Sequence, residues 1–256
     1  MKIGAQLYSV RDLVKTPEGQ KQTITTLADI GYKWVQLSPY APFNPDATKA
    51  LCDSLGVGIK LTHVATGRLL DDIDAVIEEH KRMDNPNIGI GALPGPMQSG
   101  PDGARAFLKE YAASLAAIKK AGLRFQYHNH AFEFLAEKDG ETIWDVLLNE
   151  TDPDVFGFTL DTYWVAYAGR DVAQTIRQAK GRVQVCHYKD GFLDWKDEAG
   201  ERQPRFTACG DGDLVWQPIY DAFAEIGTEY AFVEQDSSYN KDPIEELARS
   251  YRFLTK

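Results

Sequence analysis

The amino-acid sequence predicts an α/β protein, a single closed (β/α)8 barrel that extends over residues 1–256. Short β-type runs alternate strictly with longer amphipathic runs, and eight such units fill the chain. A length of about 250 residues is also typical of this barrel. An open, doubly wound sheet is the competing architecture. It is disfavoured because no glycine-rich dinucleotide fingerprint follows the first predicted strand.

The predicted strands are short runs of β-forming residues bounded by polar or turn residues. They cover residues 2–7, 33–37, 58–63, 87–92, 123–128, 156–161, 183–188 and 229–234. A helical run follows each strand and returns the chain to the same edge of the sheet. The strands are therefore expected to be mostly parallel.

The predicted helices carry apolar residues at helical spacing, as Ile24, Leu27 and Ala28 do in the first. The fourth begins with Pro-Asp and is followed by Gly122, which are typical start and stop signals. The helices cover residues 17–30, 46–55, 71–82, 101–121, 142–149, 171–180, 214–226 and 243–254. Residues 190–213, after the seventh strand, form the longest irregular stretch, and long loops of this kind often cover sites.

Composition excludes several classes of protein. Lys and Arg number 28 and Asp and Glu 38, a formal net charge of −10, which argues against binding nucleic acid or an anionic membrane. With 43% hydrophobic residues the chain can form a core, but no apolar run reaches the roughly 18 residues of a membrane helix. The amino terminus carries no secretory signal, so a cytoplasmic location is expected. Cys52, Cys186 and Cys209 lack metal-type spacing and are expected to be free thiols.

Chemically active side chains gather where the predicted strands end. They are His63, His128 and His130 with Glu133 close behind, Asp161, His187 with Lys189, and Glu234. The carboxyl ends of all strands meet at one mouth of a (β/α)8 barrel, where active sites lie. Only one of the five histidines, His80, falls on a predicted helix.

Carboxylates and imidazoles that converge on one mouth suit a divalent metal ion. Each residue also has a structural explanation: Asp161 could cap a helix, a histidine could be a core residue, and Glu234 could pair with Lys or Arg. The metal site is preferred because burying several such groups without partners would cost several kcal/mol.

Four segments resemble the sugar phosphate isomerase/epimerase family. They are Tyr-His-Asn-His-Ala-Phe-Glu-Phe at 127–134, Leu-Asp-Thr-Tyr-Trp at 160–164, His-Tyr-Lys-Asp at 187–190 and Val-Glu-Gln-Asp at 233–236. This family belongs to the xylose-isomerase-like TIM barrel superfamily, which includes ketose 3-epimerases, inosose dehydratase and endonuclease IV. The resemblance spans the chain and implies a divalent-metal enzyme that acts beside the carbonyl of a small sugar substrate.

The resemblance implies that Asp161, His187 and Glu234 are metal ligands. The fourth ligand is either Glu133 or His128, because His128 stands where ketose 3-epimerases have a Glu; Glu133 is preferred, since three carboxylates suit a hard ion. Mn²⁺ is the first expectation, with Mg²⁺, Co²⁺ or Zn²⁺ as alternatives. Family members often pair, so a homodimer is a further candidate.

The same resemblance assigns catalytic roles to His128, His130 and Lys189, because imidazoles titrate near neutral pH and a lysine can stabilise an enediolate oxygen. Substrate contacts are expected from His63 and from mouth aromatics, namely Trp164, Tyr163, Phe132 and Tyr40. No concentrated phosphate-binding site is visible, so an unphosphorylated sugar or keto-sugar is expected.

Two reactions remain open. A metal-dependent isomerase or epimerase is the leading interpretation, and a lyase or dehydratase that eliminates a β-substituent from a keto-sugar, keto-glycoside or inosose is the alternative. A glutamate at the fifth strand end would favour epimerisation, and a histidine favours elimination. An endonuclease-IV-like repair enzyme is disfavoured by the net charge of −10. A catalytically silent sugar-binding barrel is the third class.

Overall fold

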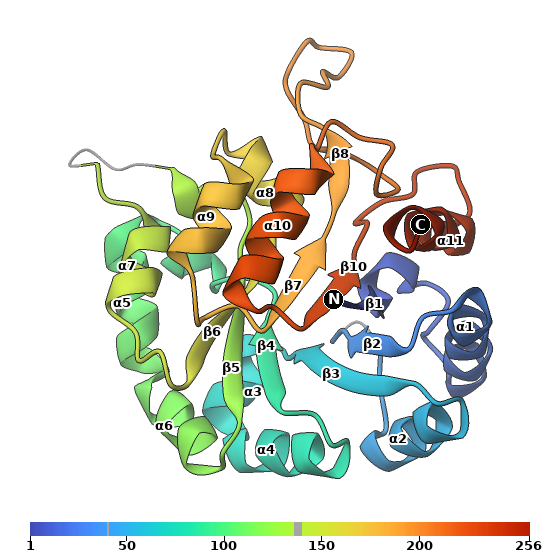
Figure 1. Ribbon diagram of the computed structural model, residues 1–256. Helices are drawn as coiled ribbons and strands as arrows, with labels where there is room; N and C mark the ends of the chain where they lie inside the picture. Colours follow the sequence, from blue (N-terminus) through green and yellow to red (C-terminus); the bar gives the residue numbers. More distant parts are fainter. Residues whose placement is uncertain (40, 136–139) are drawn as a thin grey trace.

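Eight parallel strands close into a barrel surrounded by helices in the computed structural model, which describes residues 1–39, 41–135 and 140–256 (Figure 1). The strand order around the barrel is β1-β10-β7-β6-β5-β4-β3-β2. This confirms the predicted (β/α)8 barrel. Tyr40, one of the aromatic residues expected at the mouth, lies outside the described residues.

Each predicted barrel strand is present, with ends that shift by up to two residues. The bounds are β1 Lys2–Gln6, β2 Trp34–Leu37, β3 Gly58–His63, β4 Asn87–Ile90, β5 Arg124–His128, β6 Phe156–Asp161, β7 Val185–Tyr188 and β10 Tyr230–Val233. The strands could be recognised in the sequence as apolar runs because their side chains are almost all buried, as in the fully buried β4, β6 and β7.

The helices lie outside the strands (Figure 1). They are α1 Pro17–Ile30, α2 Pro45–Ser54, α3 Thr66–Asp71, α4 Ile73–Arg82, α5 Pro101–Glu110, α6 Ala112–Lys120, α7 Ile143–Asn149, α8 Thr162–Tyr167, α9 Val172–Gln178, α10 Trp216–Ile226 and α11 Pro243–Leu254. Three short 3-10 helices are η1 Leu7–Val10, η2 Gly95–Met97 and η3 Phe132–Phe134. The helix expected over 101–121 is interrupted at Tyr111, whose φ of −91° and ψ of 5° separate α5 from α6. The expectation missed α3 and α8, which are only six residues long.

The segment expected to be irregular after the seventh strand contains a small hairpin. Strands β8 Asp190–Phe192 and β9 Arg205–Thr207 pair antiparallel, and the segment projects beyond the barrel (Figure 1). The buried carboxylate of Asp190 fastens its base, because it accepts hydrogen bonds from the backbone of Gly191 and Gly210 and from the indole of Trp216. Such short, polar strands have no hydrophobic periodicity, so sequence patterns could not reveal them.

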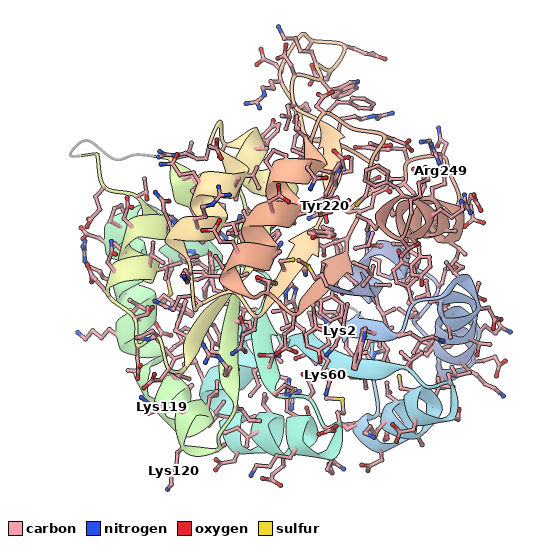
Figure 2. The ribbon with its side chains drawn as sticks, in the orientation of Figure 1. Lys2, Lys60, Lys119, Lys120, Tyr220 and Arg249 are labelled. Carbon is pink, nitrogen blue, oxygen red and sulfur yellow. The ribbon has the colours of Figure 1, made fainter. Side chains whose placement is uncertain are left out.

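One end of the barrel interior is closed by apolar packing. Three fully buried side chains form its core cluster: Leu61, Val185 and Phe232. The ring of Trp34 packs against this cluster, and the ammonium groups of Lys2 and Lys60 lie 5.6 and 5.8 Å from the ring centre. Lys2 and Lys60 lie close together at this end in Figure 2. The ionisable side chains that end β5 and β6, His128 and Asp161, lie at the opposite end of the barrel.

Two further expectations can be compared with the fold. Cys52, Cys186 and Cys209 are buried free thiols, as predicted. Within the described parts of the chain, no helix combines the length and the apolar character needed to cross a bilayer.

Candidate functional site

Four ionisable side chains meet at the carboxyl end of the barrel. They are His128 at the end of β5, Asp161 at the end of β6, His187 in β7 and Glu234 just after β10, and one ligand atom from each lies within 4.8 Å of the others. Strand register explains the convergence. Asp161 pairs directly with His187, and His187 also pairs with Phe232, two residues before Glu234. Residues two apart on a strand point to the same side, so Glu234 joins Phe232 in facing the interior.

The two imidazoles are held by their outer nitrogens. Nδ1 of His128 lies 3.0 Å from the carbonyl oxygen of Gly91, and Nε2 of His187 lies 2.7 Å from the amide oxygen of Gln36. A carbonyl oxygen only accepts hydrogen bonds, so each outer nitrogen donates its proton. The inner nitrogens, Nε2 of His128 and Nδ1 of His187, then face the carboxylates. This is the orientation that metal-binding histidines adopt when a hydrogen bond to a neighbouring group fixes the ring.

The two carboxylate oxygens of Asp161 have different partners. Oδ1 accepts the backbone N–H of Trp164 at 3.0 Å and so caps α8, while Oδ2 lies 3.2 Å from Nε2 of His128. The structure therefore confirms the cap through Oδ1, and it leaves Oδ2 facing the other ionisable side chains. Burial raises the pKa of Asp161, but the charge of Lys189 and the neighbouring imidazoles of His128 and His187 outweigh burial and hold it below its usual value.

Lys189 lies among the carboxylates with its side chain only 1% exposed. Its ammonium is 3.0 Å from Oδ2 of Asp161, 2.8 Å from Oε2 of Glu234 and 3.0 Å from Oδ1 of Asp236. Burial lowers the pKa of Lys189, but the three carboxylates raise it well above its usual value. This lysine therefore stays positively charged at neutral pH.

The residues present fit a divalent cation. Three carboxylates face one ammonium, which leaves an excess of negative charge. Unbalanced buried charge is costly, so a doubly charged cation would offset this excess. Nδ1 of His187 lies 2.9 Å from Oε2 of Glu234, yet these two buried atoms make no hydrogen bond within the described structure. Burial lowers the pKa of His187, but the charges of Glu234 and Asp161 raise it overall. A proton or a metal ion can therefore bind between this ring and the carboxylate.

The structure does not bring Glu133 into this group. Its Oε1 accepts the hydroxyl of Tyr127 at 2.6 Å and its Oε2 accepts the backbone N–H of His130 at 2.8 Å, because η3 turns the carboxylate back toward β5. Burial raises the pKa of Glu133 to about 8. Of the two candidates for the fourth ligand, the structure places His128, and not Glu133, beside Asp161, His187 and Glu234.

A cavity of about 430 Å³ opens beside the four residues. It is lined by Tyr8, Ser38, Pro39, His63, Val64, Ala65, Thr66, Gly91, Ala92, His128, His130, Glu234 and Asp236. Nε2 of His63 and Nδ1 of His130 are buried without a hydrogen-bond partner in the described structure. Burial lowers the pKa of both rings, that of His130 to about 3, so both imidazoles are neutral at pH 7.

Two of the expected aromatic contacts, Trp164 and Tyr163, differ in position. Trp164 lies beside the site, with its ring centre 5.3 Å from that of His130 and 5.5 Å from the ammonium of Lys189. Tyr163 is fully buried and does not line the cavity. Its hydroxyl donates to the carbonyl oxygen of Phe192 and accepts the N–H of Arg205, so it secures the β8–β9 hairpin. The structure therefore places Tyr163 in the support of the hairpin rather than on the cavity wall.

Sequence reasoning missed Gln36 and assigned no role to Asp236. Gln36 lies near the end of β2 and fixes His187, whereas Asp236 follows Glu234 by two residues and pairs with Lys189. Extending the examination of strand ends to β2 would have identified Gln36, because a fully buried glutamine in a barrel strand requires a polar partner.

This chain is similar in sequence to proteins that are already known. The family model described as xylose isomerase-like TIM barrel matches residues 24–256. Inosose dehydratase from Lacticaseibacillus casei is 27% identical over 150 residues, which are 53% of this chain and 48% of the relative. Inosose dehydratase from Lactiplantibacillus plantarum is 30% identical over 149 residues, with the same coverage of 53% and 48%. This chain thus spans about half the length of the curated relatives it matches.

The solved structures agree on the fold. A sugar phosphate isomerase/epimerase from Parabacteroides distasonis superposes with a TM-score of 0.79 at 20% identity and covers 99% of this chain and 97% of that chain. At this identity the likeness concerns the fold alone. The chain belongs to the xylose isomerase-like TIM barrel family.

Proposed function

We propose that this protein binds a divalent metal ion through His128, Asp161, His187 and Glu234 and removes a proton beside the carbonyl of an unphosphorylated keto-sugar, after which a β-substituent leaves. The observation that carries the metal proposal is the orientation of the two imidazoles: Gly91 and Gln36 hold the outer nitrogens, so the inner ones face two carboxylates. Two nitrogen and two oxygen donors suit Mn²⁺, Co²⁺ or Zn²⁺ better than Mg²⁺, and Mn²⁺ is the first choice.

The side chains around the cavity can supply the remaining chemistry. A bound metal ion would polarise the substrate carbonyl and so acidify the neighbouring C–H. His130 is suited to take that proton, because its ring is neutral and its Nδ1 is unpaired. Lys189 stays protonated, so it acts as a hydrogen-bond donor to the developing oxyanion rather than as a base. His63 lies on the cavity wall with a second unpaired nitrogen and can bind a sugar hydroxyl.

Elimination is favoured over epimerisation by the residue at the end of β5. In the two-base scheme of ketose 3-epimerases, two metal-bound glutamates exchange a proton on opposite faces of the substrate. This chain has His128 at the first position, and Glu133 is committed to Tyr127 and His130. The inosose dehydratases matched by this chain are named for an elimination, which supports the same choice.

Epimerisation is the second candidate, and one observation favours it. His63 and His130 both present neutral rings to the same cavity, each with an unpaired nitrogen. One ring could remove a proton from one face, and the other, once it has taken up a proton from solvent, could deliver it to the opposite face. The difference between the two reactions is therefore the fate of the β-substituent.

An unphosphorylated substrate is supported by the cavity lining. No Lys or Arg occurs among the described residues that line the cavity, and the nearby ammonium of Lys189 already faces three carboxylates. Phosphate groups are usually bound by arginine, lysine or free backbone N–H groups. A neutral sugar requires none of these.

Product analysis in deuterated water tests the reaction. The Mn²⁺-loaded enzyme should release a β-substituent from 3-keto-glucosides and from an inosose, and proton NMR should show an unsaturated ketone. Deuterium exchange with inversion at the same carbon and no release would support epimerisation instead. Absence of both exchange and release on all substrates would contradict the proposal.

Metal analysis tests the ligand set separately. His128→Asn should lose bound Mn²⁺ while the protein remains folded. His80→Asn is the matched control, because His80 is also buried but hydrogen-bonds to Thr62 and Val76 outside the four-residue group. Retention of stoichiometric metal in His128→Asn would remove His128 from the ligand set.

A further inference from the structure

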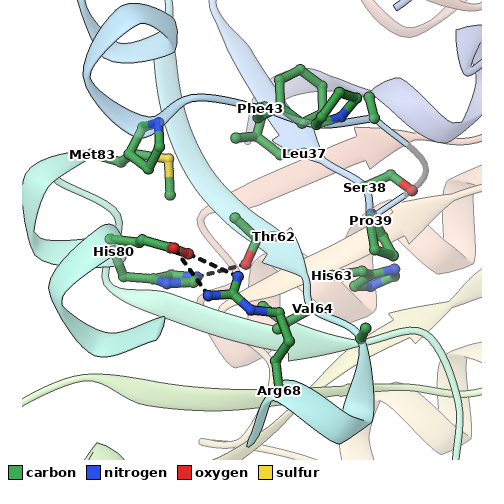
Figure 3. Close-up of a pocket in the computed structure, with 15 residues that line it drawn as sticks. Leu37, Ser38, Pro39, Phe43, Thr62, His63, Val64, Arg68, His80 and Met83 are labelled. Carbon is green, nitrogen blue, oxygen red and sulfur yellow. Dashed lines mark hydrogen bonds and ion pairs between the residues drawn. The ribbon is translucent and has the colours of Figure 1, made fainter. Parts of the chain in front are cut away.

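A second cavity adjoins the substrate cavity and has a different character. It measures about 240 Å³ and lies between the segment after β2 and the carboxyl end of β3, with α3 and α4 on its far side (Figure 3). The two cavities share the wall formed by Ser38, Pro39, His63, Val64 and Ala65. The two cavities are therefore direct neighbours.

Apolar side chains provide much of the lining of this side cavity. Leu37, Phe43 and Met83 face it, and three prolines occur in the segment after β2. Proline fixes the backbone φ angle, so part of this wall is restricted in conformation before any ligand binds. Apolar lining of a partly preformed pocket favours an apolar group over a hydroxylated one.

Four polar residues that line the side cavity away from the shared wall already have partners: Thr62, Arg68, Glu79 and His80. Arg68 makes two hydrogen bonds of 2.9 Å to Glu79, and the hydroxyl of Thr62 lies 2.6 Å from Nε2 of His80 (Figure 3). His80 completes its hydrogen bonding at the carbonyl of Val76. Because these groups satisfy one another, a ligand here gains chiefly from burial of its apolar surface.

The size of the cavity limits the ligand group. Roughly 150 Å³ of apolar cavity is enough to bind benzene in an engineered protein. The 240 Å³ available here therefore accepts one aromatic ring with a small substituent. The five lining residues shared with the catalytic cavity place the side cavity beside it, which favours a ring that belongs to the substrate over a separate ligand.

We propose that the side cavity binds an aromatic group attached to the sugar, so that the natural substrate is an aryl-bearing keto-glycoside. This inference rests on the proposed function. A base takes the proton from the carbon beside the carbonyl, the bond between the anomeric carbon and the glycosidic oxygen breaks, and that oxygen leaves with the electron pair and is protonated. An unsaturated keto-sugar and a free phenol result, without any oxidant or reductant.

Binding can be measured without turnover. Titration calorimetry with phenyl and methyl β-glucopyranoside should show at least about tenfold tighter binding of the phenyl compound to the wild-type protein, the range expected for an apolar group in a fitted pocket. Phe43→Asp should abolish this preference because it puts a charge on the apolar wall, whereas Phe43→Leu should retain it. Phe43 is only half-buried and lies outside the catalytic cavity, so both variants should fold.

A second variant tests the volume. Met83→Phe should reduce phenyl binding and leave methyl binding within about twofold, because it fills the cavity from α4. Equal affinities for the two glucosides in the wild-type protein would overturn the proposal, as would a phenyl preference that survives Phe43→Asp. A dimer that dissociates in Phe43→Asp, seen by analytical ultracentrifugation, would instead identify this face as an interface between two copies.

The reaction itself provides an independent readout. Phenoxide leaves more readily than methoxide, so the useful quantity with 3-keto derivatives of the same glucosides is the phenyl-to-methyl ratio of kcat/KM, which should be larger in the wild type than in Phe43→Asp. A phenyl preference in binding without any turnover would keep the side cavity and reject the proposed reaction. Turnover with a phenyl-to-methyl ratio that Phe43→Asp leaves unchanged would keep the reaction and reject the side cavity.

Discussion

Replacing Lys189 by Met removes the ammonium from the centre of the site and keeps most of the apolar stem. At about 3 Å and an effective dielectric constant near 20, each contact with a carboxylate has a Coulomb energy of roughly 5 kcal/mol, much of it offset by the cost of burying the lysine. Breaking a buried pair by removing one partner costs about 3–5 kcal/mol net. We therefore expect the metal-free Lys189→Met protein to be less stable than wild type by about this amount at pH 7.

Urea denaturation in the presence of EDTA measures this loss, with the exposed Lys120→Met as the matched control. The pKa values of Asp161 and Glu234 lie below their usual range in the folded protein. Their contribution to stability is therefore present above about pH 4 and is lost as the pH falls further. The difference between wild type and Lys189→Met should shrink in the same direction.

Manganese provides the second half of the test. Without the ammonium, three carboxylates attract the cation, so Mn²⁺ should stabilise Lys189→Met more than it stabilises the wild type. Equal stability of the two proteins in EDTA would refute the charge argument. So would an equal increase in stability when Mn²⁺ is added.

Three further predictions follow from the contacts around the site. Gln36→Leu should weaken Mn²⁺ binding by about 10–100-fold in a metal titration, because it frees the His187 ring. Gln36→Glu retains a hydrogen-bond acceptor and should recover part of the lost Mn²⁺ affinity. Because the pKa of Glu133 is raised to about 8, its ionisation makes the wild type less stable as the pH rises from about 5 to 8. Glu133→Gln should remove that decline in the free energy of unfolding, measured by urea denaturation, and should keep its metal. An unchanged dependence of stability on pH would argue against the raised pKa. His130→Asn should retain Mn²⁺ but lose about 10²–10⁴-fold in rate, and full activity would exclude His130 as the base.

The sequence alone was sufficient to predict the barrel and most of its polar mouth. Eight buried strands alternating with amphipathic helices leave few other ways to bury so much apolar surface. Because parallel strands end at one face, the positions of Asp161, His187 and Glu234 in the sequence already indicated that they would meet. The closed strand order and the four-residue group agree with these expectations.

The tertiary structure decided which neighbours each polar atom has. Glu133 and His128 were both candidates by position, and only the direction of η3 sends the Glu133 carboxylate to Tyr127 and His130. Gln36 contacts His187 across 151 positions of sequence, a separation at which residue patterns carry no information on contact. The side cavity beside His63 likewise exists because segments from β2, β3 and α4 pack around a space that no local pattern encodes. Periodicity reflects burial of whole elements, whereas hydrogen bonds and cavities depend on how the elements pack against one another.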